Sequence, residues 1–231
     1  MKKLLSIAVA ALASAAVAET VSVADVGITA VQTSLQNTIV AVPYESLRGI
    51  TSGTIAVKDV VKTQGVPAST ILYAYDAAQN KYYAWGISNG EWAPAAVASK
   101  TETRPASDQP DAGYTVSTGN AIWLCLAEAP VGTQTFYLYG KFVEPGVVAF
   151  AAGRNLVANI SQSEVSNLAT RITGAQKGDM IIAPDGTMYT YSRKGWVNGE
   201  TPGLPTIAAG QGFWYIAKGA GSINWGTVAA E

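Results

Sequence analysis

The sequence predicts an all-β protein, with one or two short helices, built from two tandem homologous β modules that pack together. Short runs rich in Val, Ile, Thr, Tyr and Trp are separated by Gly, Pro and Asn, a pattern that is typical of many strands. Helical spacing of apolar residues occurs in two short segments. A set of short motifs also occurs twice in the same order along the chain, which indicates an internal duplication.

The N-terminus predicts a secretory signal peptide over residues 1–18. Lys2 and Lys3 precede an alanine-rich apolar run, and Ala16-Val17-Ala18 forms a small-residue cleavage site. A membrane anchor is the weaker alternative, because this run is short and no other segment is apolar enough to span a bilayer as a helix. We therefore expect export of residues 19–231 from a bacterial cell, to the medium, the cell surface or the periplasm.

Ten runs predict strands, because each is rich in β-branched and aromatic residues and is bounded by turn residues. A capping-box spacing from Ser161 to Glu164 predicts a short helix over residues 162–170. The apolar spacing within Val57–Val61 predicts an earlier counterpart of that helix. The predicted strands are Asn37–Tyr44, Thr70–Asp76, Lys81–Gly86, Ala121–Glu128, Thr133–Lys141, Asn155–Ile160, Asp179–Pro184, Thr187–Ser192, Gly212–Lys218 and Ser222–Trp225.

The repeated motifs divide the mature chain into two copies. Residues 19–142 hold an N-terminal segment and the first module, residues 143–153 a linker, and residues 154–231 the second module. The linker contains an apolar run at 147–152, so we expect the modules to pack together and not to move independently. The motifs that we pair are Asn37–Ala41 with Asn155–Ala158, Val57 and Val60 with Val165 and Leu168, Ile71–Asp76 with Ile181–Asp185, Tyr82-Tyr83 with Tyr189, Gly90–Trp92 with Gly195-Trp196, Gly119–Leu124 with Gly210–Tyr215, and Phe136–Gly140 with Ile223–Gly226.

The most distinctive repeated motif places a glycine shortly before a tryptophan, at the start of a strand. It reads Gly119-Asn120-Ala121-Ile122-Trp123 in the first copy and Gly210-Gln211-Gly212-Phe213-Trp214 in the second. We interpret the first glycine of each copy as a turn residue with positive φ, since glycine adopts that conformation without strain. We expect Trp123 and Trp214 to point into the core of their module, with Ile122 or Phe213 on the opposite face; the less favoured alternative is an exposed ring that stacks on a sugar or a base.

These motifs resemble those of a group of uncharacterised secreted bacterial proteins. Members of that group carry an N-[IL]-V-A opening motif and a G-x-G-[FY]-W closing motif, often in tandem β-rich repeats. The matching residues here are Asn155-Leu156-Val157-Ala158 and Gly210–Trp214, whereas the first copy departs from the pattern at Thr38 and Ala121. The resemblance covers most of the mature chain, and it implies a tandem β-rich fold but no particular activity.

The inventory of side chains excludes most catalytic chemistry. The chain has no histidine, so Ser-His-Asp and Cys-His catalysis and the usual zinc sites are excluded, because each needs an imidazole. The one cysteine, Cys125, lies in an apolar run that is typical of a buried structural thiol. Asp76 and Asp185 are typical turn residues, and Asp108 and Asp111 lack the remaining ligands of a calcium loop. We therefore expect no enzyme, no metal and no cofactor.

Low charge and the predicted export favour a structural or adhesive role. Only 13% of the residues are charged and the formal net charge is −1, so no basic surface indicates a nucleic-acid partner, and the weak self-repulsion favours association. We expect a cell-surface, extracellular-matrix or filament-type subunit that binds copies of itself or other surface proteins. Edge strands and the apolar segments 21–30 and 147–152 are the expected contacts.

Two alternatives remain open at this stage. Polar residues flank Trp92 and Trp196, so these rings, together with Tyr83 and Tyr189, are candidates for exposed side chains that stack on a glycan in a carbohydrate-binding module. A glycan-active enzyme is the second alternative, because acid–base catalysis by carboxylates is the chemistry that the side-chain inventory leaves.

Overall fold

The computed structural model describes residues 18–23, 26–45, 54–98, 104–111, 113–161 and 163–226. This part of the chain is mainly β, with 53% strand and 4% helix, so the predicted mainly-β class is confirmed. Each helix has four residues, and none within these ranges is long and apolar enough to cross a membrane. Apart from Ala18, the predicted signal peptide lies outside the described residues.

Strands and two single-turn helices alternate with turns through the described residues. The first half of the chain forms β1 (Ala18–Val23), β2 (Val26–Thr33), β3 (Asn37–Ala41), β4 (Tyr44–Glu45), β5 (Thr54–Ala56), α1 (Val57–Val60), β6 (Ile71–Asp76), β7 (Lys81–Ser88), β8 (Glu91–Ala95), β9 (Thr115–Ser117), β10 (Ala121–Cys125) and β11 (Gln134–Phe142). The second half forms β12 (Val147–Phe150), β13 (Gly153–Ala158), α2 (Leu168–Arg171), β14 (Ile172–Thr173), β15 (Met180–Ile182), β16 (Met188–Ser192), β17 (Gly195–Asn198), β18 (Thr201–Pro202), β19 (Gly212–Ala217) and β20 (Gly221–Asn224).

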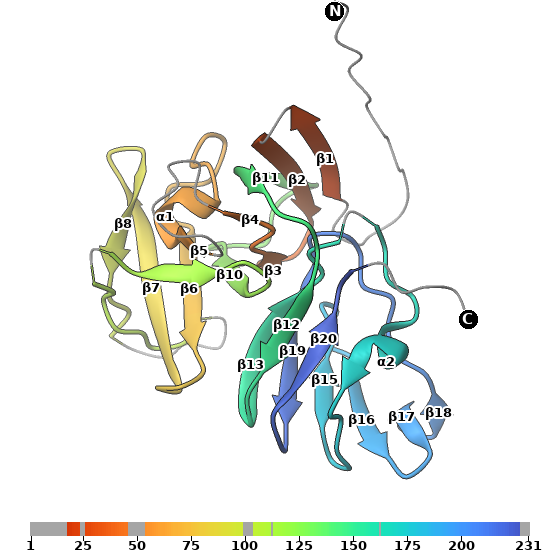
Figure 1. Ribbon diagram of the computed structural model, residues 1–231. Helices are drawn as coiled ribbons and strands as arrows, with labels where there is room; N and C mark the ends of the chain where they lie inside the picture. Colours follow the sequence, from red (N-terminus) through yellow and green to blue (C-terminus); the bar gives the residue numbers. More distant parts are fainter. Residues whose placement is uncertain are drawn as a thin grey trace, which may run out of the picture.

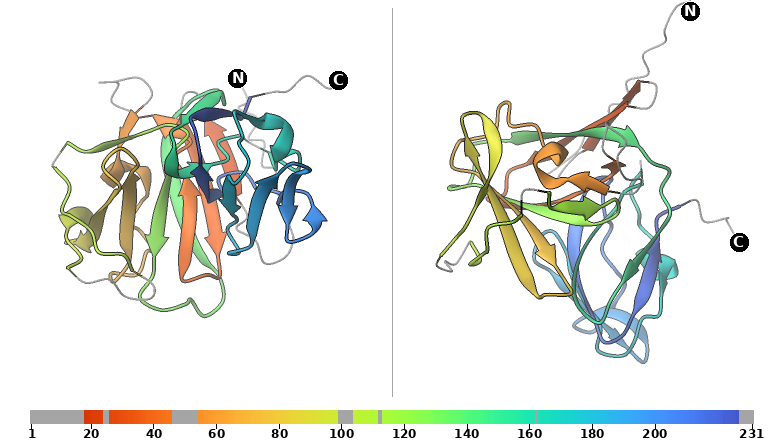
Figure 2. Two further views of the ribbon diagram at one scale, coloured as in Figure 1. Left: turned by 90° about the horizontal axis from the view of Figure 1, so that it is seen from below. Right: turned by 60° about the vertical axis from the view of Figure 1, so that its left-hand side comes forward.

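The sheets are arranged as a four-bladed, propeller-like ring (Figure 1 and Figure 2). The first half forms a small sheet in the order β1-β2-β11-β4 and a large sheet in the order β3-β10-β6-β7-β8, and β5 pairs with β9. The second half forms a small sheet β12-β20-β14 and a large sheet β13-β19-β15-β16-β17-β18. The two large sheets meet where β3 and β10 contact β13 and β19.

The two halves repeat the same strand order and register. Strands β3, β10, β6, β7 and β8 of the first large sheet correspond to β13, β19, β15, β16 and β17 of the second. The helices α1 and α2 also precede equivalent strands, as the spacing within Val57–Val61 predicted for the first half. Equivalent pairs in the two registers are Ala121–Ala41 and Gly212–Ala158, Trp123–Tyr73 and Trp214–Ile182, and Ile87–Trp92 and Tyr191–Trp196.

The registers correct two of the motif pairings. Asn155 is equivalent to Thr38 and not to Asn37. Tyr189 is equivalent to Trp85 and not to the Tyr82-Tyr83 pair. The ladder of β6 and β7 extends further toward its turn than the ladder of β15 and β16: it has six registered pairs, from Ile71–Gly86 to Asp76–Lys81, against three, from Met180–Thr190 to Ile182–Met188. The two halves therefore carry tyrosine at different positions of this ladder, although the hydrogen-bonded register of the ladder is the same in both.

The helix predicted over residues 162–170 is wrong in its extent. Helix α2 begins at Leu168, while Val165 forms an antiparallel bridge with Ile207 through two backbone hydrogen bonds of 2.9 Å. The Ser161 hydroxyl bonds to the side chain of Asn159 and does not cap a helix. This bridge to a segment distant in sequence overrides the local capping signal at this position.

The predicted linker at 143–153 is also corrected. Val147–Phe150 forms β12, which pairs antiparallel with β20 in the small sheet of the second half. Phe150 is 5% exposed and packs 4.4 Å from the ring of Tyr215. The apolar run is therefore a structural strand of the second half and not a connection between two modules.

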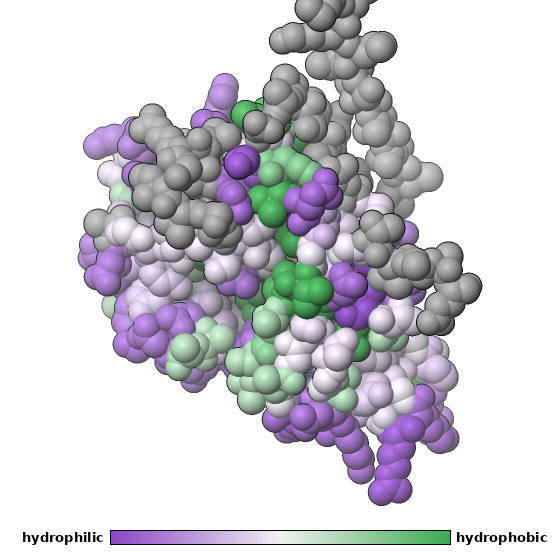
Figure 3. Space-filling model, in the orientation of Figure 1, coloured by the Kyte–Doolittle hydropathy of each residue, from purple (hydrophilic) through white to green (hydrophobic). Residues whose placement is uncertain are grey.

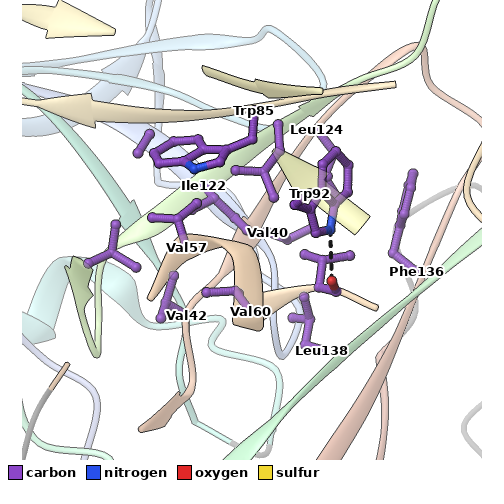
Figure 4. Close-up of a cluster of buried hydrophobic side chains, with 14 of the residues drawn as sticks. Val40, Val42, Val57, Val60, Trp85, Trp92, Ile122, Leu124, Phe136 and Leu138 are labelled. Atoms are coloured by element: carbon purple, nitrogen blue, oxygen red, sulfur yellow. Dashed lines mark hydrogen bonds between the residues drawn. The ribbon is translucent and has the colours of Figure 1, made fainter. Parts of the chain in front are cut away.

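Each half has its own hydrophobic core between its small and its large sheet. In the first half, Ile122 and Leu124 of β10 share a buried cluster with Phe136 and Leu138 of β11 (Figure 4). The corresponding cluster of the second half contains Phe213 of β19 and Ile223 of β20. Each half thus covers one face of its large sheet by itself, and the other face is available for contact between the halves.

The halves contact each other where the strand pair β3–β10 meets the strand pair β13–β19. The Ala41 amide donates to the Gly210 carbonyl at 2.8 Å, and Val40 forms an antiparallel bridge with Gln211. The equivalent bridge joins Asn120 to Val157. Because equivalent positions make the same bridge twice, the contact is pseudosymmetric.

Gly212 lies at the closest approach of the two halves. A Cβ on this residue would lie 2.3 Å from Ile39 Cγ2 and 3.1 Å from the Ala121 Cβ. Its φ is not positive, unlike that of Gly119 (+95°) and Gly210 (+74°), which are the turn residues that the motif predicted. Gly119 and Gly210, the first glycine of each motif, are therefore required because their φ is positive. Gly212 is required because a side chain there would collide with Ile39.

We expect Gly212→Ala to lower the free energy of unfolding by about 1–3 kcal/mol, because an added methyl group forces Ile39 and Ala121 out of their packed positions. Urea denaturation of the full chain measures this effect. Gly146→Ala is the matched control, since a Cβ on Gly146 meets no atom within 4 Å. Adding Ile39→Ala to Gly212→Ala should recover part of the loss, and equal midpoints for Gly212→Ala and the parent protein would refute the steric explanation.

Candidate functional site

Trp123 and Trp214 are both half-buried and pack against the cluster that contains Phe213, so the prediction is wrong for Trp123, which does not pack against the large cluster of its own half. Side chains alternate along a strand, and the fully buried Ile122 and Phe213 occupy the core-facing positions. The two tryptophans lie half-buried on the opposite faces of their sheets. Those faces meet each other, so the glycine–tryptophan motif builds the contact between the halves.

Five aromatic side chains form a continuous cluster at this contact, which we call the aromatic seam. The ring of Tyr75 lies 5.1 Å from Trp214 in an edge-on arrangement and 5.0 Å from Tyr82. The Trp123 ring lies 5.7 Å from Tyr73 and 6.1 Å from Tyr82. Aromatic pairs of this geometry contribute about 0.5–1.5 kcal/mol beyond the burial of their area. The seam therefore holds both tryptophan rings in fixed positions.

A groove of about 340 Å³ opens beside the aromatic seam, between the turn before β3 and the turn that joins β15 to β16. We call it the open groove. Its volume falls within the range of about 300–1,000 Å³ that is usual for small-ligand pockets. Its lining combines Trp123, Trp214, Leu35, Ile39, Pro184 and Pro205 with the polar residues Thr33, Ser34, Asn37, Thr38, Asp185, Thr206 and Gln211.

A smaller groove of about 190 Å³ is the counterpart of the open groove under the repeat. The segment Tyr75-Asp76-Ala77 lines it, as the equivalent segment Pro184-Asp185-Gly186 lines the open groove. Neither Trp123 nor Trp214 is among its lining residues. Since Tyr75 packs edge-on against Trp214, the tyrosine covers the indole on this side. We call this smaller site the closed groove.

Two polar atoms in the wall of the open groove are buried without a hydrogen-bond partner. They are the Oδ1 atom of Asn37, an acceptor, and the Nε1 atom of Trp123, a donor. An unsatisfied buried polar atom destabilises a fold by about 1–3 kcal/mol. Both atoms are closed to solvent, so the accessible polar groups of the groove are those of its exposed lining residues, such as Ser34, Asp185 and Thr206.

The hydroxyl of Tyr73, in the same seam, is also buried without a partner. Burial raises the pKa of Tyr73 to about 12, an effect that Cys125 strengthens and Arg104 opposes. Cys125 itself is fully buried, as the sequence predicted, and burial raises the pKa of its thiol. The thiol is therefore protonated at neutral pH and is a poor nucleophile.

The residues proposed for glycan stacking are not exposed as predicted. Trp92 and Trp196 are each 5% exposed and belong to the two cores. The Nε1 atom of Trp92 donates to the carbonyl of Val61 at 2.8 Å (Figure 4). Tyr83 and Tyr189 are half-buried and pack against the same cores. Glu91, the polar neighbour of Trp92, lies in the same strand β8, where successive side chains point to opposite faces, so a polar neighbour does not indicate an exposed ring.

The carboxylates considered for catalysis or metal binding have local structural partners. Asp76 accepts the backbone amides of Ala78 and Gln79 at 2.9 and 3.1 Å, and Asp185 accepts that of Thr187 at 2.9 Å, as expected for turn residues. Asp108 forms an ion pair of 2.9 Å with Lys81. No group of three or more Cys, Asp or Glu side chains suited to a metal ion occurs within the ranges that the structure describes.

Asp179 is a buried functional group whose role the sequence did not indicate. It is fully buried, and it accepts hydrogen bonds from the Tyr215 hydroxyl at 2.7 Å and from the amides of Gln176 and Lys218 at 2.9 and 2.7 Å. Burial and this carboxylate raise the pKa of Tyr215, so the phenol is a permanent donor at neutral pH. The equivalent residue in the first half is Thr70, and the network therefore anchors the second half alone.

No family model, curated protein or solved structure matches this chain. The resemblance to secreted tandem-repeat proteins therefore stays a prediction from the motifs.

Because Trp92 and Trp196 are core residues, we expect Trp92→Ala and Trp196→Ala each to destabilise the fold by about 3–5 kcal/mol. The free energy of unfolding in urea, followed by far-UV circular dichroism, gives the measurement. Trp92→Phe should lose less than Trp92→Ala, since the phenyl ring retains most of the packing and loses the bond to Val61. An unfolding midpoint unchanged by either alanine substitution would contradict the burial.

Stability should fall at alkaline pH through the buried tyrosines. The pKa of Tyr73 is raised from 10.0 to about 12 in the folded state, so its contribution is complete below pH 10 and is lost as the pH rises through about 12. The slope is up to about 1.4 kcal/mol per pH unit for each such tyrosine. Tyr73→Phe should reduce the slope and leave stability at pH 7 unchanged or higher, since it removes an unpaired hydroxyl. Identical slopes for both proteins would contradict this assignment.

Proposed function

We propose that the protein is an exported structural or adhesive protein without catalytic activity, and that it associates with copies of itself through its first small sheet. The outer face of β2 and β11 carries this proposal, because Val26, Ile28 and Tyr137 are 38%, 43% and 45% exposed. Ile28 lies opposite Tyr139 and Tyr137 lies opposite Ala30, so the register places these side chains on one face. An apolar sheet face of this kind is a typical contact surface between proteins.

Strand β1 adds an exposed edge to this surface. It pairs with β2 along its whole length, and no other described strand pairs with its second edge. The unpaired amides and carbonyls of an edge strand are a template for a strand of another chain. Since the predicted cleavage site follows Ala18, removal of the signal peptide would leave β1 at the N-terminus of the exported protein.

The two apolar segments expected to make contacts differ in what they offer. Strand β2 is paired on both edges, so it contributes only its outer face. Strand β12 is an edge strand, and its Val147 is 66% exposed. Figure 3 shows apolar side chains over the region of β2 and β11 and again over β12. Both regions support an assembly of copies, and the low net charge of −1 leaves little repulsion to oppose it.

We infer that the two halves are homologous modules that arose by tandem duplication. The shared strand order, the matching registers and the repeated glycine–tryptophan motif support this inference. The repeated residues are those that build cores and the contact between the halves. A duplication of this kind favours a structural role over a catalytic one.

Self-association is tested by sedimentation velocity of residues 19–231 over a range of concentrations, with negative-stain microscopy. We expect the sedimentation coefficient to rise with concentration, and Ile28→Lys to abolish the rise because it places a charge in the apolar contact. Met188→Lys is the matched control, since Met188 is an exposed apolar residue on β16 of the second half. A parent protein that stays monomeric at every concentration, or equal effects of both substitutions, would refute this proposal.

A further inference from the structure

We propose that the open groove binds a neutral glycan, with sugar rings stacked on the indoles of Trp123 and Trp214. The groove is formed by the turn before β3 in the first half and by the turn between β15 and β16 in the second, so both halves are needed to complete it. This site is separate from the outer face of β2 and β11, and the proposal does not depend on self-association.

The two indoles are positioned before a ligand arrives. The Trp214 ring is packed edge-on against Tyr75 at 5.1 Å and against Tyr82 at 6.2 Å, and the Trp123 ring lies 5.7 Å from Tyr73. A rigid aromatic surface loses little conformational entropy when a ligand binds. The apolar face of a pyranose ring, which carries only C–H groups, is the part of a sugar that packs on such a surface.

The polar groups of the groove suit hydroxyl groups. The exposed hydroxyls of Ser34 and Thr206 line the groove together with the exposed carboxylate of Asp185. A sugar hydroxyl both donates and accepts, so it can pair with each of these groups. Trp123 Nε1 and Asn37 Oδ1 are closed to solvent, so neither is a contact for the ligand.

The charge of the groove selects a neutral ligand. Asp185 is the one charged residue in its lining as described, and its carboxylate is exposed. A carboxylate accepts hydroxyl donors strongly and repels phosphate, sulfate and acidic sugars. A proline-rich peptide also packs on aromatic grooves, but its prolines have no N–H to donate to the exposed carboxylate of Asp185. The lining therefore favours a glycan over such a peptide.

The repeat provides an internal comparison for this site. Tyr75 covers Trp214 in the closed groove, and the equivalent Pro184 leaves the open groove accessible. Tyr75 and Pro184 each lie two residues after the registered residues Tyr73 and Ile182, but Tyr75 is paired within the β6–β7 ladder and Pro184 lies in the turn between β15 and β16. Pro184→Tyr should therefore close the open groove in the way that the protein already closes its counterpart.

Isothermal titration calorimetry of the full exported chain tests the proposal with hexasaccharides of β-1,4-glucose, α-1,4-glucose, β-1,4-N-acetylglucosamine and β-1,4-mannose. We expect at least one of these to bind with one site per chain, and tetragalacturonic acid not to bind. Pro184→Tyr should weaken binding by about tenfold or more, and Asp185→Asn by about tenfold, a loss of roughly 1.4 kcal/mol. Tyr75→Ala should add a second site by uncovering the closed groove.

The control variants distinguish glycan binding in the open groove from self-association through β2 and β11. Ile28→Lys should bind the hexasaccharide as the parent does, because it alters only the proposed association face. Circular dichroism must show Pro184→Tyr to be folded, and Asp185→Asn provides an independent loss of binding if it is not. Absence of binding by every hexasaccharide, unchanged affinity in both Pro184→Tyr and Asp185→Asn, or binding of a decaproline peptide in place of the sugars would overturn the proposal.

Discussion

The close approach of the two halves at Gly212 constrains the structure around it. Gly212 has no side chain and Ala121 has only a methyl group. The strand pairs β3–β10 and β13–β19 therefore come close enough for Val40 to pair with Gln211. The equivalent pairing of Asn120 with Val157 fixes the second side of the contact. Two large sheets held in this way must bury their facing surfaces, and the tryptophans two residues after Ala121 and Gly212 occupy that space.

The same repeated framework carries different side chains in its two copies, and these differences give the molecule its asymmetry. Tyr75 covers one side of the aromatic seam, whereas Pro184 leaves the other side open. A buried carboxylate, Asp179, anchors the second half at a position where the first half has Thr70. Backbone pairing tolerates such exchanges because the ladders do not depend on the identity of the side chain. The same strand order can therefore hold an open groove on one side and a smaller, covered groove on the other.

The aromatic residues show how a chain with few charges builds a large fold. Four of the six tryptophans are at most 5% exposed and belong to the cores, namely Trp85, Trp92, Trp196 and Trp225. The two indoles at the contact are the exception, since they are half-buried and border the open groove. The proposed glycan site thus lies where the two halves meet, which is a common location of ligand sites.

The sequence by itself determined the mainly-β class, the repeat, the burial of Cys125 and the turn role of Gly119 and Gly210, since these depend on local preferences and on the order of motifs. It also showed that Ile122 and Trp123 point in opposite directions. Only the tertiary structure decided which of those directions faces the core of the same half, because that depends on which distant segment covers each face. For the same reason the sequence could not indicate that Trp92 and Trp196 are buried, that Val165 pairs with Ile207, or that Gly212 lies against Ile39. Each of these features is decided by a contact between residues far apart in the chain.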